Sequence, residues 1–403
     1  MSSVGILGAG AMGQGIAHVA SIGGWNVRLF DIDVSVAHAA CASIAARLNK
    51  RVERGRMSAE DAQAAIARIE VAHEPSHLSA CDLLLEAIVE DMDIKVQALS
   101  VLLGHLRSDA IIATNTSSLS VTSLGQQLGC PERVCGMHFF NPAPVMKLVE
   151  VVAGEHTSDS VVDTVASIAT TWGKTVARCA DTPGFIVNRV ARPYYLEAFR
   201  CLEDGLGAPD GIDSAMREAA GFRMGPFELT DLIGHDVNTA TTRSVWSSWN
   251  KPTRLMPVHA QESLVASGDL GRKTGCGVYS YAGESPVAVI GPSQQALTLT
   301  PSLTAAAAGI AAAVSAAAGQ LPPPLQVAMM RVLCGLFNEA MWAKADGVAD
   351  AHAIDTAMLF GVNYPKGPFQ WMVDLGEPVV DAAFEALCAD VSEDRFARPA
   401  TGA

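Results

Sequence analysis

The stretch VGILGAGAMG, residues 4–13, decides the fold of the first part of this chain. A short apolar run leads into three glycines, Gly8, Gly10 and Gly13, and apolar residues then recur at helical spacing. This order predicts a strand, a tight turn and a helix. Gly8 permits the turn, Gly10 lets backbone amides approach a pyrophosphate, and Gly13 lets the helix pack closely on the strand. A turn of this kind is typical of a dinucleotide-binding site.

An acidic residue, Asp31, follows Gly13 by 18 residues and ends a second predicted strand, residues 26–30. Its carboxylate can accept hydrogen bonds from the adenosine ribose and would repel a 2′-phosphate, which favours NAD over NADP. Ala11 and Met12 complete the turn between the second and third glycines. We therefore expect NAD to bind here; the alternative is a glycine-rich turn without a ligand.

Further apolar runs at residues 83–85, 111–113 and 133–140 predict strands that alternate with helical patterns. Such alternation is typical of a doubly wound, mostly parallel sheet. We therefore expect an α/β Rossmann-type N-terminal domain over residues 1–182. The later sequence reads as successive helices, so all-α C-terminal domains should follow.

The helical part contains an internal repeat. Residues 185–234 can be laid over residues 327–376 at a constant offset of 142 without a gap. Identical pairs recur along the whole overlay and include Arg189/Arg331, Glu197/Glu339, Asp204/Asp346, Asp213/Asp355 and Gly225/Gly367. The chain therefore carries a duplicated helical unit.

We expect the first copy to form a domain over residues 183–281 and a degenerate second copy to occupy residues 325–395. The stretch between them, 282–324, is rich in Ala and Pro and is expected to be a partly helical linker. Asn188 of the first copy corresponds to Met330 of the second, so we interpret the first copy as catalytic and the second as structural. The copies should pack as the subunits of a dimer do, giving a monomer with an internal pseudo-dimer or a homodimer.

The composition excludes several classes of function. The net charge of −14 and the lack of a basic stripe argue against a nucleic-acid partner. No run of twenty strongly apolar residues predicts a membrane span, and the chain starts with a strand-like run rather than an export leader. Nine cysteines form no CxxC pair, which argues against a metal site or disulfide framework. We expect a cytoplasmic protein.

Polar side chains that suit acid–base chemistry follow apolar runs at residues 115–118, at His138, at Glu150 and at Asn188. His138 ends a predicted strand, a proline-containing turn follows, and Glu150 lies on the predicted returning strand. A histidine faced by a carboxylate is typical of a general base with the group that orients it. Each residue also has a structural interpretation: a core histidine, a surface ion pair with Lys147, a turn cap or a loop contact.

The motifs taken together resemble the 3-hydroxyacyl-CoA dehydrogenase family, nearly unbroken from residue 4 to about residue 281. The segments that carry the resemblance are GAGAMGQGIA at 8–17, EAIVED at 86–91, NTSSL at 115–119, HFFNPAPVMKLVEVV at 138–152, DTPGFIVNR at 181–189 and GPFEL at 225–229. The resemblance implies an enzyme that uses NAD to oxidise an L-3-hydroxyacyl-CoA reversibly to the 3-ketoacyl-CoA. Longer bacterial relatives with two helical domains act on 3-hydroxybutyryl- or 3-hydroxyadipyl-CoA, so these are the expected acyl-CoA substrates.

The resemblance also implies roles for single residues. It makes His138 the acid/base and Glu150 its partner, while Ser117, Asn141 and Asn188 contact or organise the substrate.

For the cofactor, the resemblance implies that Glu90, Lys95, Asn115 and Lys273 line the NAD site. Without it, the three charged residues would be interpreted as exposed charges at a helix start and in a glycine-rich turn.

Coenzyme A carries a phosphorylated adenosine, and the densest basic cluster of the chain is Lys50, Arg51, Arg54 and Arg56. We expect this helix tip to hold that phosphate; a solvated basic face is the alternative.

Two other functions remain open from the sequence. One is a dehydrogenase of the same fold that acts on a free hydroxy acid, such as a sugar acid or carnitine. The other is a non-catalytic NAD-binding protein.

Overall fold

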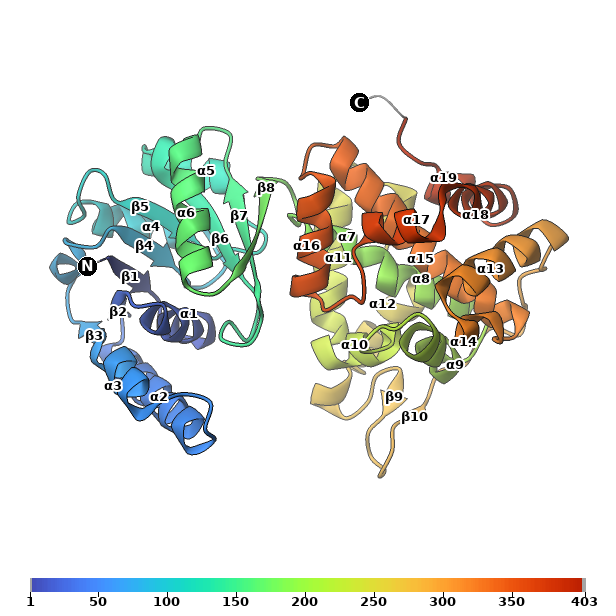
Figure 1. Cartoon of the computed structure of the whole chain (residues 1–403), viewed down its shortest axis with the longest axis horizontal. Coiled ribbons are helices and arrows are strands. Elements are labelled where there is room, and N and C mark those ends of the chain that lie inside the picture. The colour runs from blue at the N-terminus through green and yellow to red at the C-terminus, as the bar shows by residue number, and fades with distance from the viewer. Residues whose placement is uncertain (1, 401–403) are drawn as a thin grey trace. The chain divides into compact units, whose positions relative to one another are not determined.

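The computed structural model describes residues 2–400. They fall into two compact units that meet in the sequence between Phe185 and Ile186 (Figure 1).

The first unit is an α/β domain built on one eight-stranded sheet of order β3-β2-β1-β4-β5-β6-β7-β8. Strands β1 to β6 are parallel, β7 runs antiparallel to β6, and β8 is parallel to β7. This confirms the predicted Rossmann-type fold. The elements are β1 Ser3–Leu7, α1 Ala11–Ile22, β2 Asn26–Phe30, α2 Val34–Glu53, α3 Ala59–Ala67, β3 Ile69–Ala72, β4 Leu83–Glu86, α4 Met92–Leu103, β5 Ile111–Thr114, α5 Val121–Leu128, β6 Val134–Phe139, β7 Leu148–Ala153, α6 Asp159–Thr171 and β8 Thr175–Ala180.

The core of this unit explains the apolar runs in the sequence. Strands β4, β5 and β6 are buried along their whole length, as expected for sheet strands covered on both faces. Apolar side chains of α1, α2, α3 and α6 share one core with the strands. The polar residues that end β4, β5 and β6 are thereby held on a rigid edge.

The second unit is almost entirely helical and contains both copies of the repeat. Its helices are α7 Val187–Val190, α8 Arg192–Glu203, α9 Pro209–Ser214, α10 Pro226–Ile233, α11 His235–Ser248, α12 His259–Ser267, α13 Pro301–Val314, α14 Ala316–Gly319, α15 Pro323–Ala345, α16 Ala351–Gly361, α17 Pro368–Leu375, α18 Glu377–Asp390 and α19 Glu393–Phe396. Two short strands, β9 Tyr279–Ser280 and β10 Val287–Ala288, form a small antiparallel pair.

The two copies fold alike to the level of single residues. Helices α10 and α17, and likewise α11 and α18, begin and end at positions related by the same offset of 142. Asp213 accepts hydrogen bonds from the backbone N–H groups of Phe227 and Glu228 at 2.9 and 3.0 Å. Asp355 repeats this cap at the start of α17, accepting from Phe369 and Gln370 at 2.8 Å each.

The residue directly before each capped helix is a glycine, because the aspartate carboxylate occupies the space that a side chain would need. A Cβ on Gly225 would lie 2.3 Å from atoms of Asp213, and one on Gly367 would lie 2.2 Å from Asp355. Both contacts are shorter than atoms tolerate, so each GPF motif encodes the same helix start.

The long helices α8 and α15 pack against each other and bring the copies together. Arg189 pairs with Glu339 at 2.6 Å and with Asp346 at 2.5 Å. Arg331 pairs with Glu197 at 3.2 Å and Asp204 at 2.6 Å. Each arginine of one copy therefore binds the carboxylates that the other copy supplies at the equivalent positions.

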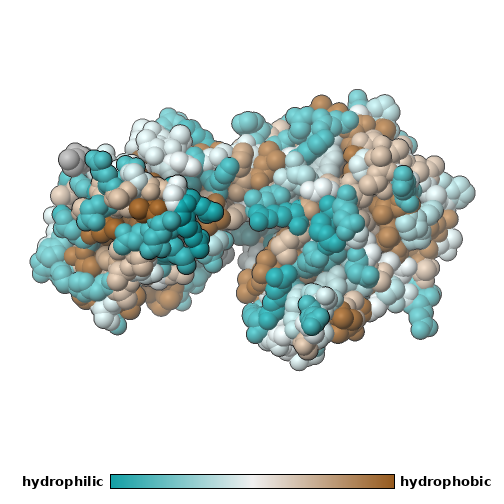
Figure 2. All heavy atoms as spheres, turned by 60° about the horizontal axis from the view of Figure 1, so that its bottom comes forward, coloured by the Kyte–Doolittle hydropathy of each residue, from teal (hydrophilic) through white to brown (hydrophobic). Residues whose placement is uncertain are grey.

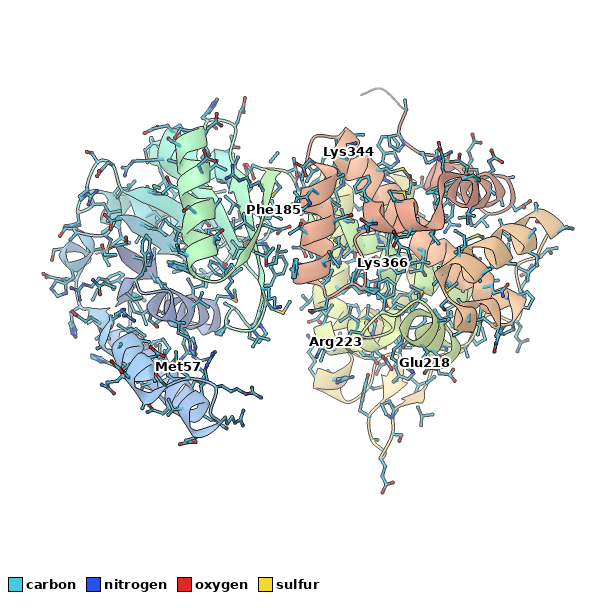
Figure 3. All side chains as sticks on the ribbon, in the orientation of Figure 1. Met57, Phe185, Glu218, Arg223, Lys344 and Lys366 are labelled. Atoms are coloured by element: carbon cyan, nitrogen blue, oxygen red, sulfur yellow. The ribbon has the colours of Figure 1, made fainter. Side chains whose placement is uncertain are left out.

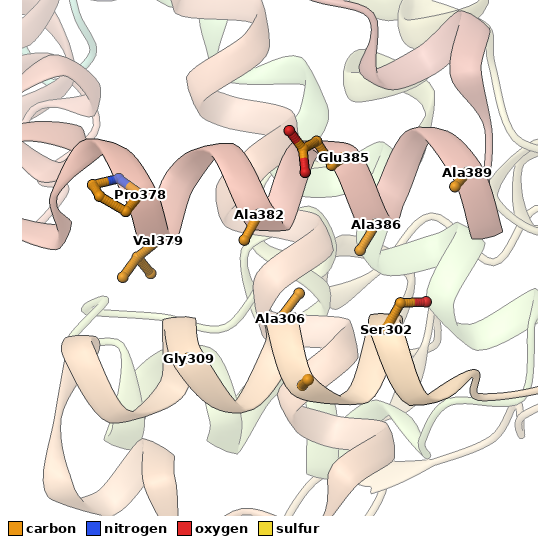
Figure 4. A pocket seen from close by; sticks show the side chains of 10 residues that line it. Ser302, Ala306, Gly309, Pro378, Val379, Ala382, Glu385, Ala386 and Ala389 are labelled. Carbon is orange, nitrogen blue, oxygen red and sulfur yellow. The ribbon is translucent and has the colours of Figure 1, made fainter.

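The stretch 282–324, which we expected to be a linker, contributes to the core of the second unit. Helix α13 packs against α15 and α18, and its Leu303 and Ile310 are fully buried. Ala306 of α13 points toward Ala382 and Ala386 of α18 across a shallow groove (Figure 4). The small alanine side chains of α13 let this helix pack against its neighbours. Composition alone does not distinguish such a packed helix from a flexible linker.

The surface mixes hydrophilic and hydrophobic side chains over both units, as the face in Figure 2 shows. Within residues 2–400, no helix combines the length and apolar character that crossing a membrane requires. The same residues contain no group of three or more His, Cys, Asp or Glu placed to hold a metal ion. All nine cysteines are free thiols.

Candidate active site

His138 and Glu150 form a buried pair across the hairpin of β6 and β7. The antiparallel register places the two residues directly opposite each other. Nδ1 of His138 lies 2.7 Å from Oε2 of Glu150, and the residues are 6% and 0% exposed. A carboxylate at Nδ1 fixes the ring orientation and favours the tautomer with its proton there. Nε2 is then the ring nitrogen available to exchange a proton.

This geometry is not the surface ion pair considered from the sequence. Glu150 is fully buried, whereas Lys147 is exposed.

Aromatic rings enclose the imidazole. The ring centroids of Phe140 and Phe185 lie 4.6 and 5.8 Å from that of His138. Phe185 is the last residue of the first unit and is labelled in Figure 3. Its φ of 46° lies in the left-handed region, which is uncommon for a residue other than glycine. The backbone of Phe185, in the turn after β8, therefore adopts a strained conformation. This conformation accompanies the placement of an apolar ring beside the histidine.

The loop after β5 is tied to the strand that carries His138. Oδ1 of Asn115 accepts a hydrogen bond from the backbone N–H of Phe139 at 2.9 Å. Asn115 therefore connects the ends of β5 and β6, and the loop that bears Ser117 begins beside the histidine.

Glu90 organises that loop from the other side. Its Oε1 accepts hydrogen bonds from Oγ1 of Thr116 at 2.6 Å, the backbone N–H of Ser117 at 2.9 Å and Oγ of Ser118 at 3.0 Å. Burial acts to raise the pKa of Glu90, but these hydrogen bonds and the charge of Lys95 outweigh it and hold the pKa below its ordinary value. Glu90 is therefore an acceptor-only anchor for the loop.

Lys95 lies in a buried charge network rather than on an exposed helix start. Its Nζ contacts Oε1 of Glu86 at 2.6 Å and Oε2 of Glu90 at 3.2 Å, and the lysine is only 1% exposed. The other oxygen of Glu86 accepts from Oγ1 of Thr114 at 2.6 Å. Glu86 and Thr114 were not among the site residues predicted from the sequence, whereas Thr116 lies in the polar segment 115–118. The signal was present, since a carboxylate ends an otherwise apolar strand and a lysine follows nine residues later.

The glycine turn has the shape that a dinucleotide needs. Gly8 has a φ of 98°, and a Cβ on Gly13 would lie 1.8 Å from the carbonyl oxygen of Gly8. A Cβ on Gly10 would meet nothing within 4 Å, so that position faces open space. The first turn of α1 has no acidic residue and no side-chain cap, which leaves its N–H groups for an anion.

Asp31 is fixed against this turn. Its Oδ2 accepts a hydrogen bond from the backbone N–H of Ala9 at 2.8 Å, and its Oδ1 accepts from that of Asp33 at 3.0 Å. The carboxylate at the end of β2 therefore lies beside the glycines, and the donors and open space present fit NAD.

Three further predicted residues are distributed over the two units. Asn141 is exposed in the β6–β7 connection. Asn188, in α7, and Lys273, in the turn 272–274, belong to the second unit, where Nζ of Lys273 pairs with Asp236 at 2.5 and 2.6 Å. Met330, the counterpart of Asn188, is fully buried in α15.

The basic cluster at the end of α2 divides in two. Lys50, Arg54 and Arg56 are exposed, whereas Arg51 is half-buried. Lys50 and Arg51 occupy the last turn of the helix, where positive charge is favoured.

Comparisons with known proteins show the family of this chain. The model of the 3-hydroxyacyl-CoA dehydrogenase NAD-binding domain matches residues 3–182, and that of the family's C-terminal domain matches twice, at residues 184–281 and 328–401. The double match confirms the predicted duplication.

Two curated relatives differ in the length that they share with this chain. The chain is 39% identical to 3-hydroxyadipyl-CoA dehydrogenase of Escherichia coli over 98% of its length and 95% of the relative's. It is 37% identical to 3-hydroxybutyryl-CoA dehydrogenase of Bradyrhizobium diazoefficiens, but this match covers 71% of the chain and 98% of the relative.

A solved structure also matches almost end to end. The crystal structure of 3-hydroxybutyryl-CoA dehydrogenase from Escherichia coli K12 aligns with a TM-score of 0.87 at 37% identity, covering 99% of this chain and 97% of that one. The chain therefore belongs to the 3-hydroxyacyl-CoA dehydrogenase family and is an NAD-dependent oxidoreductase.

Proposed function

We propose that the His138–Glu150 pair is the acid/base centre for oxidation of an L-3-hydroxyacyl-CoA. The buried 2.7 Å contact between Nδ1 and the carboxylate carries this proposal. As the C3–H bond breaks, the 3-hydroxyl must lose its proton, and Nε2 of the imidazole is positioned to accept it. Glu150 stabilises the imidazolium that forms.

Bound NAD supplies the hydride acceptor. Loss of the hydride from C3 and of the proton from the hydroxyl converts the alcohol to the ketone, and the reverse transfers restore it. The glycine turn, Asp31 and the loop anchored by Glu90 and Lys95 would hold the cofactor. Ser117, Asn141 and Asn188 would hold the substrate oxygens and turn C3 toward the hydride acceptor.

The acyl-CoA substrate is proposed to be 3-hydroxyadipyl-CoA or the short-chain 3-hydroxybutyryl-CoA. Relatives with these names match the chain at similar identity. The exposed side chains Lys50, Arg54 and Arg56, with Arg51, are proposed to attract the phosphates of coenzyme A.

We further propose a cytoplasmic enzyme that is active as a single chain, with the second helical copy in the place of a partner subunit. Light scattering on the active enzyme distinguishes this state from a homodimer by its mass.

The test is NADH formation or consumption by the purified protein with six compounds: 3-hydroxybutyryl-CoA, acetoacetyl-CoA, 3-hydroxyadipyl-CoA, a medium-chain 3-hydroxyacyl-CoA, L-gulonate and carnitine. Activity confined to the thioesters supports the proposal, and the ratio of kcat/KM values identifies the acyl group. Activity only on the free acids would replace it with a free hydroxy-acid dehydrogenase. No change in NADH with any of the six compounds, in a protein that still binds NADH, would indicate a non-catalytic NAD-binding protein.

A further inference from the structure

A cavity of about 250 Å³ lies in the first unit, away from the His138–Glu150 pair and the glycine turn. Its walls come from the C-terminal half of α1, the end of α2, the β6–β7 connection and the turn before β8. The volume is below that of most drug-sized ligand pockets, roughly 300–1,000 Å³, and so suits a small group. His18 lies eight residues after Gly10, which puts it roughly 12 Å along the helix axis from the end that faces the pyrophosphate.

Several hydrogen-bonding nitrogens of the side chains that line this cavity have no partner among residues 2–400. They are Nδ1 and Nε2 of His18, Nε of Arg51 and Nε1 of Trp172. His18 is 3% exposed and Trp172 is 5% exposed. Buried nitrogens without partners are rare in folded proteins because their lost hydration is not replaced. Four around one cavity indicate a ligand rich in hydrogen-bond acceptors.

The charges around the cavity specify the sign of that ligand. Arg51, Lys147 and Lys174 line it, and no carboxylate does. Nζ of Lys174 donates to the carbonyl oxygens of Ala143 at 2.5 Å and Met146 at 2.7 Å, and an ammonium has a third donor. The net charge of the chain is −14, but the charged side chains that line this cavity are all basic.

The imidazole of His18 reports the same potential. Burial, with smaller contributions from the charges of Arg47, Arg51 and Lys174, lowers its pKa to about 4. Burial also lowers the pKa of Lys174 to about 8. An anion beside Arg51 and Lys174 would favour the charged form of the partly buried lysine.

We propose that this cavity binds a phosphate-class anion, held by Arg51 and Lys174 and by N–H groups of His18 and Trp172. The deprotonated oxygens of phosphate accept hydrogen bonds from Arg51, Lys174, Trp172 and the N–H of His18, and its P–O–H group can donate to the other nitrogen of the neutral imidazole. It is either free inorganic phosphate or a phosphate of a larger ligand such as coenzyme A. The binding does not rest on the proposed dehydrogenase reaction.

The direct test is calorimetric titration of the full-length protein with inorganic phosphate, in a phosphate-free buffer at constant ionic strength. Arg51→Met should raise the phosphate Kd by about 10-fold or more, the usual effect of losing a charged hydrogen-bond donor. Arg178→Met is the matched control, because it makes the same substitution at an exposed arginine of the first unit that lines neither this cavity nor the basic cluster of α2. Its Kd should stay within about 2-fold of the wild-type value. Equal weakening by both variants, or no phosphate binding by the wild type, would overturn the proposal.

His18→Leu separates a binding role from a packing role. Leucine keeps an apolar volume in α1 and removes both unpartnered nitrogens, so the melting temperature without phosphate should not fall. Phosphate should then raise the melting temperature of the wild type but not of this variant. The same phosphate-dependent increase in both proteins would show that His18 is an ordinary core residue.

Competition identifies the source of the phosphate. If coenzyme A displaces inorganic phosphate, and Arg51→Met raises the KM for the acyl-CoA by the same factor as the phosphate Kd, the ligand is the substrate. If saturating coenzyme A leaves phosphate binding unchanged, the ligand is the free ion. The titration requires no turnover, so a failure of the dehydrogenase proposal would leave its result interpretable.

Discussion

Arg189 and Arg331 occupy equivalent positions in the two helical copies, and each pairs with carboxylates of the other copy. Arg189 contacts Glu339 at 2.6 Å, and Arg331 contacts Glu197 at 3.2 Å. Both guanidinium groups are fully buried. The exchange has the symmetry of a two-fold dimer interface, although one chain supplies both halves.

Arg331→Met should strongly destabilise the second unit. The change leaves Asp204 without its arginine and Glu197 with only Arg200 and Arg395, and removing one member of a buried pair costs about 3–5 kcal/mol. Urea unfolding measures the loss. Arg398→Met is the control, because its pair with Asp381 is about 40% exposed, and it should cost less than about 1 kcal/mol. Equal losses in the two variants would refute a structural role for the exchange.

The pH dependence of stability should follow Glu197. Burial acts to raise its pKa, but Arg200, Arg331 and Arg395 overcome burial and lower the pKa from 4.5 to about 2. A lowered carboxyl pKa contributes stability that is present above about pH 4.5 and is lost as the pH falls toward 2. Urea unfolding at pH 5, 4 and 3 should therefore show falling stability. Glu197→Gln should be less stable at pH 6 and show a shallower slope; an unchanged slope would assign the effect to other groups.

Gly10→Ala should impair NAD binding without unfolding the protein. Its φ of −64° suits alanine and the new Cβ meets no protein atom within 4 Å, so only a closely approaching ligand would be obstructed. The NADH dissociation constant, followed by nicotinamide fluorescence, should rise by about 10-fold or more. Gly13→Ala is the contrast, because its Cβ would overlap the carbonyl of Gly8, and it should lower the melting temperature. Normal NADH affinity in Gly10→Ala would mean that the pyrophosphate lies elsewhere.

Asp31→Ala should weaken NAD binding and relax the discrimination against NADP. The variant loses both the ribose acceptor and the negative charge that opposes a 2′-phosphate. The ratio of kcat/KM for NAD and NADP measures the change. Asp33→Ala removes a charge two residues away and the cap of α2, and it should leave that ratio unaltered. If both variants shift the ratio alike, a general charge effect explains the preference.

His138→Gln should lower turnover by roughly 10²- to 10⁴-fold, the usual contribution of a positioned acid/base. NADH binding should be nearly unchanged, because the imidazole is assigned to the substrate. Steady-state rates with acetoacetyl-CoA and NADH provide the measurement, and His105→Gln, at an exposed position, controls for loss of a histidine. Near-normal turnover in His138→Gln would remove the residue from the mechanism.

Much of the fold could be predicted because the relevant signals are local. The glycine turn, Asp31 and the buried strands follow from patterns within about thirty residues. The pairing of His138 with Glu150 was also within reach, since one hairpin fixes the register between them.

Other features depend on contacts that the sequence does not order. The repeat was visible as an offset, but that Arg189 binds the carboxylates of the other copy rather than its own follows only from the packing of α8 against α15. Glu86, Thr114 and Lys95 meet because neighbouring strands end at the same edge of the sheet. We predicted a linker at the alanines of α13 because alanine is common both in flexible connections and where helices pack closely.

The interface made by Arg189 and Arg331 joins segments of one chain, so its occupancy cannot depend on protein concentration. The covalent connection supplies a fixed effective concentration of each half for the other, and dilution cannot separate them. It also frees the halves to diverge, because a mutation in one is no longer copied into the other. Asn188 and Met330 occupy equivalent positions and show such divergence. The first copy has a polar, half-buried asparagine there, and the second has a fully buried methionine.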